Sequence, residues 1–378
     1  MWGRVRNFVA AVVKAAPVVG WFVPLLGMAV LAGGCTSAGQ RPPAGEGEPE
    51  PGQSPPAGQR HQALPADCTD TITGPDRVRA ALNTAVPGSI VCFSGDDLAD
   101  SPVVMIRSGT AAAPIRLVSD GGTVREVQIR ADYVTVEGFT VTGGAGVLLE
   151  GTGVTARNNT VHDTRQGGIT CDSCTDATIE FNTMRHVATN GIDITGSRIT
   201  VHANTISDTV AVDGGDADGM RFYGTGHRIT DNTIFDISAQ GYANPPHPDC
   251  FQTLDNGKPP TFDVVIAGNT CRNVDAQCLI ATGDQSGNAG APSGVSSIVF
   301  ENNLCANNGA QAVNVRRWPR VVVRDNIFSG PNLTRAVLIT EGSTGCTVAD
   351  NTTTAGRPTV QVDRSSQPGT HVGNDRPG

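Results

Sequence analysis

A short repeat runs through this chain from about residue 154: an aliphatic residue, then Asn a few positions later, most often followed by Thr. The stretch Val201-His-Ala-Asn204-Thr is a typical copy. Successive copies place Asn 23, 22, 28, 37, 34, 23 and 25 residues apart. The repeated residues are Asn159, Asn182, Asn204, Asn232, Asn269, Asn303, Asn326 and Asn351. A period of this length indicates a solenoid, in which each repeat packs on the next one.

Each unit also contains a second short apolar segment, such as Gly191-Ile192-Asp193. The segments are rich in β-branched residues, have Gly and Asn at their ends and lack helical periodicity, which predicts short parallel strands. Asn tolerates left-handed corners, and stacked Asn side chains can hydrogen-bond from coil to coil.

This pattern resembles the right-handed parallel β-helix of the pectate-lyase-like superfamily, over residues 88–362 approximately. The resemblance implies an all-β, right-handed parallel β-helix solenoid. An open solenoid end needs a cap. Residues 75–85 have a Pro near their start and apolar residues at helical spacing, so we expect a capping helix there.

The first 34 residues read as a targeting segment, because basic residues precede an apolar run over 15–32. The run ends at Leu31-Ala32-Gly33-Gly34-Cys35, which resembles a bacterial lipoprotein signal and implies lipidation of Cys35. The alternative is an uncleaved anchor helix. Either outcome exports the protein, as a cell-envelope lipoprotein or in secreted form.

We expect a disordered Pro/Gly-rich tether over 35–65, the β-helix over 66–365 and a polar tail over 366–378. The chain has a net charge of −9, which disfavours nucleic acid as a partner. Membrane contact is expected only through the N-terminal lipid anchor, and the domain is expected to be a monomer.

Ten cysteines in an exported chain predict disulfides. Cys68 and Cys92 are the best candidate pair, because both lie in the N-terminal cap region. With Cys35 set aside nine remain, so at least one thiol is unpaired. Cys171-Asp-Ser-Cys174 is more typical of a loop staple, or of two separate thiols, than of a redox site.

Residues 213–258 differ from the rest of the repeat, because Asp, Arg, His, Tyr, Gln and Lys side chains are concentrated in two successive units. The longer Asn spacings place loop insertions at 209–217, 238–248, 255–262 and 283–294. Long loops on neighbouring coils commonly wall a binding cleft. The candidate catalytic residues are Asp218, Arg221, His247, Asp249 and Lys258. The candidate substrate-binding residues are Asp193, Tyr223, Tyr242, Gln252 and Asp255.

Strand alternation predicts where the side chains of the short segments point. The predicted inward column is Ile169, Ile192, Met220, Phe251, Leu279, Val313 and Val337. The predicted outward column is Thr170, Asp193, Arg221, Gln252, Ile280, Asn314 and Leu338. The residues that open the segments are Gly167, Asn190, Asp218, Asp249, Gln277, Gln311 and Arg335. Asp218 is therefore expected one coil from Asp249, although both could merely cap strand corners.

The favoured chemistry is β-elimination on a uronate-containing polysaccharide by a polysaccharide lyase. A calcium ion held by Asp213, Asp216 and Asp218 would neutralise the sugar carboxylate. Lyases of this fold often use Lys or Arg as the base, and Lys258 is the one lysine after residue 14. Arg221 and His247 are the other candidate proton acceptors.

Two other reactions fit the same residues. Glycoside hydrolysis would use Asp218 and Asp249 as its carboxylate pair. Uronate epimerisation would return the proton to the opposite face of the sugar. Outside catalysis there are two rivals. One is a carbohydrate-binding or adhesin solenoid, although aromatic residues amount to only 4% of the chain. The other is a structural or phage-fibre-like repeat, which should be uniform and lack a single polar region.

Overall fold

The computed structural model describes residues 63–95, 97–283, 292–353 and 359–373. The predicted targeting segment, Cys35 and almost all of the predicted tether lie outside these residues, as do parts of the last predicted insertion and of the tail. The chain divides into two units, residues 1–55 and 56–378. All described residues belong to the second unit.

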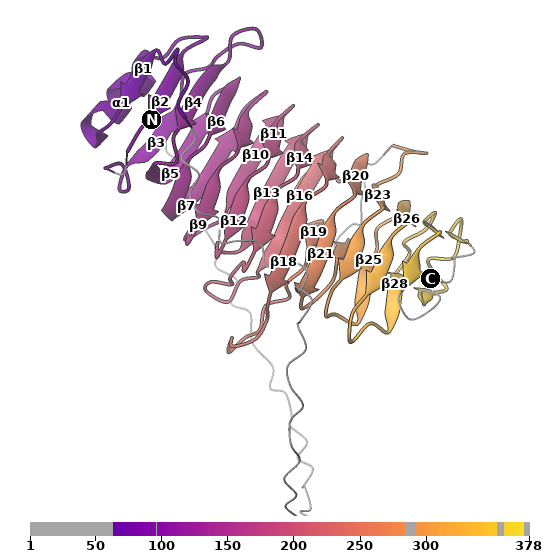
Figure 1. The fold of residues 1–378 in the computed structure, drawn as a ribbon. Helices are drawn as coiled ribbons and strands as arrows, with labels where there is room; N and C mark the ends of the chain where they lie inside the picture. Colours follow the sequence, from indigo (N-terminus) through magenta and orange to yellow (C-terminus); the bar gives the residue numbers. More distant parts are fainter. Residues whose placement is uncertain (1–62, 96, 284–291, 354–358, 374–378) are drawn as a thin grey trace, which may run out of the picture. The chain divides into compact units, whose positions relative to one another are not determined.

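Three faces of parallel strands wind along this second unit (Figure 1). On each face, a strand pairs in parallel with its counterparts in the turns before and after it. The first face contains β1 (Asp70–Ile72), β2 (Ile90–Phe93), β4 (Ile115–Ser119), β6 (Val134–Glu137), β8 (Thr155–Arg157), β11 (Thr178–Glu180), β14 (Thr200–His202), β17 (Arg228–Thr230), β20 (Val264–Ala267), β23 (Ile298–Glu301), β26 (Val321–Arg324), β29 (Thr347–Ala349) and β32 (His371–Val372).

The other two faces share the long strands β5 (Thr123–Arg130) and β7 (Thr140–Glu150), whose two halves pair on different faces. The second face continues with β9 (Thr160–His162), β12 (Thr183–Arg185), β15 (Thr205–Ser207), β18 (Thr233–Ile237), β21 (Thr270–Val274), β24 (Leu304–Ala306), β27 (Ile327–Ser329) and β30 (Thr352–Thr353). The third face begins with β3 (Pro102–Met105) and continues after β7 with β10 (Ile169–Thr175), β13 (Asn190–Ser197), β16 (Asp218–Thr225), β19 (Phe251–Leu254), β22 (Leu279–Thr282), β25 (Gln311–Arg316), β28 (Arg335–Thr340) and β31 (Val360–Val362). The predicted parallel β-helix is confirmed.

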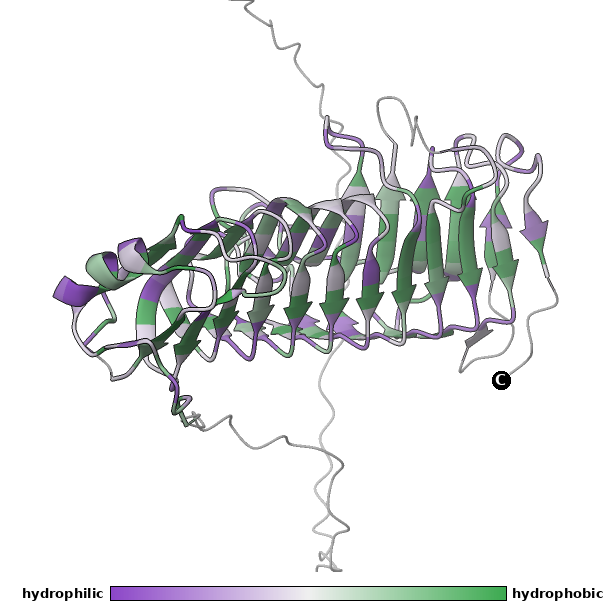
Figure 2. Ribbon diagram, turned by 90° about the horizontal axis from the view of Figure 1, so that it is seen from above, coloured by the Kyte–Doolittle hydropathy of each residue, from purple (hydrophilic) through white to green (hydrophobic). Residues whose placement is uncertain are grey.

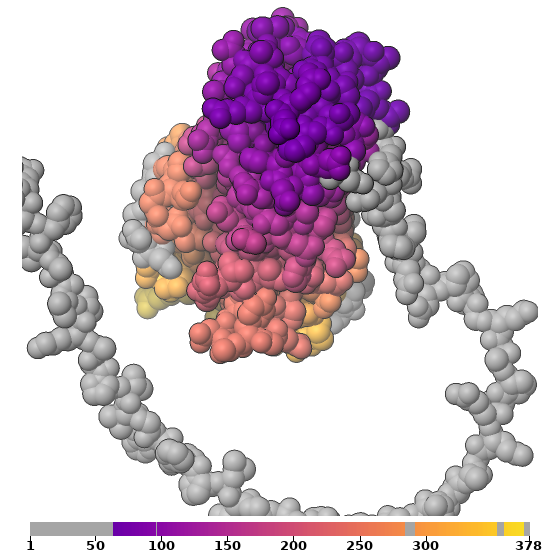
Figure 3. All heavy atoms as spheres, turned by 90° about the vertical axis from the view of Figure 1, so that its left-hand side faces the viewer, coloured from indigo at the N-terminus to yellow at the C-terminus, as the bar shows by residue number. Residues whose placement is uncertain are grey.

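Helix α1 spans Pro75–Thr84, within one residue of the predicted segment. It buries Val78, Ala81 and Leu82 and contacts β1 and β3, the first strands of two faces. Figure 3 looks onto this N-terminal end, where the first turns lie in front of the later ones. In the described part of the chain, no helix is long and apolar enough to cross a membrane.

The inward column of the third face lies in the interior of the solenoid, together with buried apolar residues of the other two faces. Ile192, Met220 and Phe251 pair with one another in register and are fully buried, as predicted. The strands are largely hydrophobic in Figure 2, whereas the turns at their ends carry much of the polar character. Burial of this apolar surface is the main source of stability for the fold.

The repeated asparagines form a buried ladder at the corner between the first and second faces. The side-chain oxygen of Asn232 accepts hydrogen bonds from the backbone N–H and the side-chain amide of Asn204, at 2.9 and 3.0 Å. Asn232 in turn donates both groups to Asn269 in the next turn, at 2.8 and 3.0 Å. The predicted stacking of Asn residues from coil to coil is therefore confirmed, and each member satisfies backbone groups that would otherwise be buried without partners.

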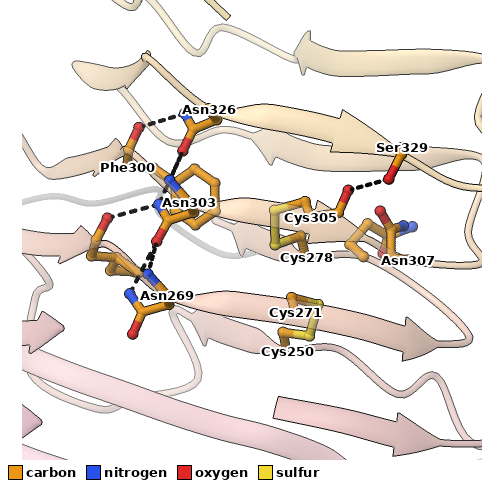
Figure 4. Close-up of a disulfide and its surroundings, with 12 residues drawn as sticks. Cys250, Asn269, Cys271, Cys278, Phe300, Asn303, Cys305, Asn307, Asn326 and Ser329 are labelled. Atoms are coloured by element: carbon orange, nitrogen blue, oxygen red, sulfur yellow. Dashed lines mark hydrogen bonds between the residues drawn. A yellow bond between two sulfur atoms is a disulfide. The ribbon is translucent and has the colours of Figure 1, made fainter. Parts of the chain in front are cut away.

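The described part of the chain contains four disulfides. Cys68 pairs with Cys92, as predicted, and Cys171 pairs with Cys174 within β10. Cys250–Cys271 and Cys278–Cys305 lie one turn apart inside the solenoid (Figure 4). Cys346 is the unpaired thiol among the described cysteines, and it is buried. These disulfides are consistent with an exported protein.

The two stacked disulfides replace a tight glycine contact of the earlier turns. A Cβ atom on Gly219 would lie only 2.5 Å from Ile234 Cγ2. One turn later Cys250 occupies the glycine position, and Cys271 occupies the isoleucine position in register with Ile234. The close approach that demands glycine in one turn is thus filled by a covalent bond in the next.

Candidate functional site

The candidate site lies on the third face, where loops enter β16 and β19. Arg221 pairs in register with Asp193 of β13 on one side and with Gln252 of β19 on the other. Asn190 pairs with Asp218 in the same way. The predicted outward and opening columns are therefore confirmed here, because three consecutive turns bring these side chains together.

Asp218 and Asp249 each use one oxygen to hold the next turn. Asp218 Oδ1 accepts the backbone N–H of Asp249 at 3.0 Å, and Asp249 Oδ1 accepts that of Gln277 at 2.8 Å. Both side chains are fully buried. The corner-capping interpretation is thus correct for one oxygen of each carboxylate.

The second oxygen of each carboxylate holds the side chain of a candidate site residue. Asp218 Oδ2 accepts a hydrogen bond from Arg221 Nε at 2.7 Å, and Arg221 also reaches Asp216 Oδ2 at 3.2 Å. The Arg221 side chain is only 19% exposed, so these ion pairs leave its guanidinium little freedom.

Asp249 Oδ2 lies 3.0 Å from His247 Nδ1 and also accepts a hydrogen bond from Gln252 Nε2 at 3.2 Å. The backbone N–H of His247 donates to Asp216 Oδ1 at 2.7 Å, which ties the two inserted loops together. The His247 side chain is 55% exposed, and among the described residues none forms a hydrogen bond with its Nε2 atom. A buried carboxylate therefore orients an accessible imidazole.

The burial of this cluster changes its protonation. Burial raises the pKa of Asp249, although its hydrogen bond with His247 opposes that effect. Burial and the nearby Asp249 charge raise the pKa of Asp218 well above its ordinary value. The hydrogen bond with Asp249 is the main cause that raises the pKa of His247 to about 9. His247 is therefore a cation at neutral pH.

A second group lies along β13 and β16. The Lys258 ammonium lies 5.5 Å from the centroid of the Tyr223 ring, so the loop after β19 passes over Tyr223. Tyr223 is almost fully buried, and burial raises its pKa to about 12. Burial also raises the pKa of the half-buried Asp193, whereas the charges of Lys258 and Arg221 lower it. The outer face therefore presents a cation beside a carboxylate.

Several predicted site residues do not join this cluster. The Tyr242 hydroxyl accepts the backbone N–H of Ala211 at 3.1 Å and so ties two inserted loops together. Asp213 is exposed on a turn with a left-handed backbone. Asp255 is half-buried at the end of β19, where its N–H donates to Thr282 O at 3.2 Å. We infer positions in loops for these three residues rather than contacts with Asp218 or His247.

The predicted calcium ligands are not gathered either. Within the described ranges, no group of three or more His, Cys, Asp or Glu side chains is placed to hold a metal ion. Asp218 uses both oxygens for Asp249 and Arg221, and Asp216 is bonded to Arg221 and His247. In this arrangement these residues do not fit a calcium site. A requirement for calcium remains a prediction.

Sequence reasoning missed the residues that frame the cluster. On the following turn, the backbone N–H of Gln277 donates to Asp249. Cys250 and Cys278, which each form a disulfide, directly follow Asp249 and Gln277 in the chain. The sequence does contain a signal for this packing: the residue after each member of the opening column is Gly, Cys or Ala, which indicates a tightly packed position. Two cavities of the described surface lie elsewhere: one of about 410 Å³ beside α1 and β3, the other of about 370 Å³ between β5 and β7.

Residues 145–353 match the family described as right handed beta helix region. The chain belongs to this family. No curated protein is significantly similar to this right-handed β-helix protein in sequence.

Solved structures share the fold of this right-handed β-helix protein. The catalytic unit of an α-1,3-glucanase from Streptomyces thermodiastaticus is 14% identical over 83% of this chain and 69% of its own, with a TM-score of 0.59. An alginate lyase from Paenibacillus sp. is 17% identical over 78% of this chain and 98% of its own, with a TM-score of 0.49. Pectate lyase Pel9A is 14% identical over 77% and 73%, also with a TM-score of 0.49. At such identities the similarity shows the fold alone.

Proposed function

We propose that this protein is a carbohydrate-active enzyme that cleaves a uronate-containing polysaccharide by β-elimination, with His247 as the proton acceptor. The observation that carries the proposal is the accessible His247 imidazole held by the buried carboxylate of Asp249. The fold similarity to an α-1,3-glucanase supports a carbohydrate substrate in general terms. Fold alone does not decide the reaction.

In this proposal, His247 Nε2 removes the proton from the carbon beside the sugar carboxylate. The electron pair forms the new carbon–carbon double bond, the glycosidic carbon–oxygen bond on the neighbouring carbon breaks, and the leaving oxygen takes a proton from water or from the imidazolium. Asp249 fixes the ring through Nδ1 and stabilises the charge that develops on it.

The substrate carboxylate needs a cation while negative charge builds up on it. Lys258 is exposed and lies over Tyr223, next to the outward face of Asp193. We assign Lys258 to this carboxylate and Asp193 to sugar hydroxyls. Gln252, expected to bind substrate, is buried and donates to Asp249 Oδ2, so we assign it to holding that carboxylate. Arg221 is held by Asp216 and Asp218, so we assign it a positioning role.

Hydrolysis is the second candidate, and Asp193 is the observation that favours it. Asp218 and Asp249 are fully buried and cannot reach a glycosidic oxygen. Asp193 is partly exposed, and its pKa is raised by burial, as a general acid requires.

The test is to incubate the purified chain with alginate, polygalacturonate and a neutral glucan, and to follow both reducing ends and the ultraviolet absorbance of an unsaturated product. We expect absorbance with a uronate substrate and a loss of roughly 100-fold or more in His247→Asn. The matched control is His186→Asn, because His186 also pairs with a carboxylate, Asp208, at 2.9 Å on an ordinary turn.

Three outcomes would contradict the lyase assignment. Reducing ends without absorbance, abolished in Asp193→Asn, would establish hydrolysis. An inverted uronate without chain cleavage would establish epimerisation. Tight binding without any product would leave a carbohydrate-binding solenoid.

The proposed base predicts an alkaline pH profile. Because the pKa of His247 is about 9, the fraction of neutral imidazole rises tenfold per pH unit below that value. We expect kcat/KM to increase up to about pH 9 and then level off. A rate that falls as pH rises through 9 would instead make His247 an acid.

A further inference from the structure

A second concave site lies on the third face at the strand-start edge, away from His247. It is a cavity of about 370 Å³ lined by Arg125 and Glu126 of β5, by Gly143, Gly144 and Ala145 of β7, and by Arg165 and Gln166 of the turn that enters β10. None of these residues belongs to the site described above.

The cavity carries positive charge that the protein leaves largely unused. Arg165 is exposed, and among the described residues none forms an ion pair with it. The Arg125 side chain is 48% exposed, and its ion pair with Glu126 is long, at 3.7 Å. Two accessible guanidinium groups stand out in a chain with a net charge of −9.

The acidic residue in the cavity is already engaged. Glu126 Oε1 accepts a hydrogen bond from Gln128 Nε2 at 3.0 Å, and its Oε2 accepts the backbone N–H of Ala145 at 3.3 Å. Glu126 carries a single negative charge, so it balances only one of the two arginines, and its ion pair with Arg125 is long. An incoming anion would therefore find free donors.

The backbone keeps the floor of the cavity open. A Cβ atom on Gly144 would lie 2.4 Å from Arg125 O, so a side chain cannot fill this position. Gly144 O accepts the backbone N–H of Arg165 at 2.8 Å, which sets the base of that side chain beside β7. Gly143 has no heavy atom within 4 Å of the place a Cβ would take.

The cavity is aligned with the candidate site along the solenoid. The strands β7, β10, β13, β16 and β19 pair in that order, and His247 precedes β19 as Arg165 precedes β10. Three turns separate the two positions, which corresponds to about 14 Å at the usual spacing of paired strands. A polysaccharide of a few sugar units spans this distance.

We propose that Arg125 and Arg165 form a distal subsite that binds a carboxylate group of the same uronate polysaccharide, several sugars away from the bond that is cleaved. Guanidinium groups match carboxylate geometry with paired N–H donors. This subsite rests on the proposed function, because it assumes that an acidic glycan lies along the third face.

The experiment compares Arg165→Ala, Arg125→Ala and the double variant with the full chain, using oligouronates of increasing length. We expect KM for long oligomers to rise about tenfold in the double variant, with kcat unchanged and the shortest cleaved oligomer unaffected. The effect should weaken at high salt. Arg185→Ala is the matched control, because Arg185 is an exposed arginine on the second face.

Failure of the subsite and failure of the proposed reaction give different results. If long and short substrates are cleaved as in the unmodified chain, or if both lose activity equally, the subsite is overturned and the reaction stands. If the chain cleaves nothing but binds alginate or polygalacturonate in a manner that depends on Arg165, the subsite stands and β-elimination falls. Unchanged melting temperatures of the variants verify that they are folded.

Discussion

Two buried columns of side chains in this protein accept hydrogen bonds from backbone N–H groups of a neighbouring turn, one with amides and the other with carboxylates. In the asparagine ladder, Asn232 accepts the N–H of Asn204 and passes the pattern on to Asn269. At the start of the third-face strands, Asp218 accepts the N–H of Asp249, and Asp249 that of Gln277. In both columns, a side-chain oxygen therefore connects one turn to the next by a hydrogen bond.

The difference is what the rest of the side chain does. The amide of Asn232 donates to carbonyl oxygens and to its neighbour, so the ladder is electrically neutral and complete. A carboxylate has no donor but keeps a second oxygen, which binds Arg221 in one turn and His247 in the next. A carboxylate at a capping position thus holds both a backbone N–H group and a charged side chain, whereas the amide ladder holds only neutral groups.

The most direct test of this difference is to place a carboxylate in the neutral asparagine ladder and measure the stability of the protein. Asn232→Asp buries a charge with no cation nearby and removes donors to Val201 O and Thr230 O. We expect the free energy of unfolding to fall by about 4 kcal/mol, measured by denaturant titration. Asn302→Asp, next to the ladder but exposed, is the control. A small effect would mean that the ladder tolerates charge as well as the third-face column does.

The stacked disulfides test how much the carboxylate column depends on covalent cross-links beside it. Removing Cys250–Cys271 by a double Ala substitution should cost about 3 kcal/mol, because the bond closes a loop of 21 residues. Removing Cys171–Cys174, three residues apart, should cost about half as much. Thermal unfolding of both double variants measures the difference. Equal losses would show that loop closure does not set the contribution.

Asp218→Asn keeps the oxygen that holds Asp249 and removes the charge that holds Arg221. We expect a loss of about 2 kcal/mol in unfolding free energy, because a half-buried guanidinium loses a charged partner. Asp176→Asn breaks the exposed pair with Arg198 and should change stability by less than about 0.5 kcal/mol. If the two variants are equally stable, burial adds nothing to the Arg221 pair.

The smallest expected effect is a pH dependence that the amide ladder cannot show. The pKa of His247 rises from 6.5 to about 9 on folding, so its stabilisation is complete below pH 6.5 and is lost as pH rises through 9. The exposed ring limits the change to about 1 kcal/mol. The difference in unfolding free energy between the unmodified chain and His247→Asn should shrink over this range. A difference that grows with pH would contradict the assigned pair.

The repeating part of the molecule was predictable from the sequence, and the inserted part was not. The Asn period predicted the ladder, and strand alternation placed Met220 inside and Arg221 outside, because every turn imposes the same register on the next. The columns also placed Asp249 one turn from Asp218 and next to β16, the strand that carries Arg221.

The inserted loops do not share this register, so the contacts of their side chains could not be predicted from the sequence. Nothing in the sequence fixes which oxygen of Asp218 meets a backbone N–H, or that Tyr242 ties loops together instead of facing a sugar. The pairing of Cys250 with Cys271 depends on a packing distance between two faces, which a list of spacings does not contain.

Every described disulfide joins residues no more than 27 positions apart in the chain. Each bond can therefore close between neighbouring parts of the chain, without a cysteine from a distant part of the sequence. A solenoid that is cross-linked in this way needs no long-range search between cysteines, and Cys346 is the one thiol left unpaired among the described cysteines. Local pairing of this kind limits the number of wrong disulfides that oxidation of the chain can form.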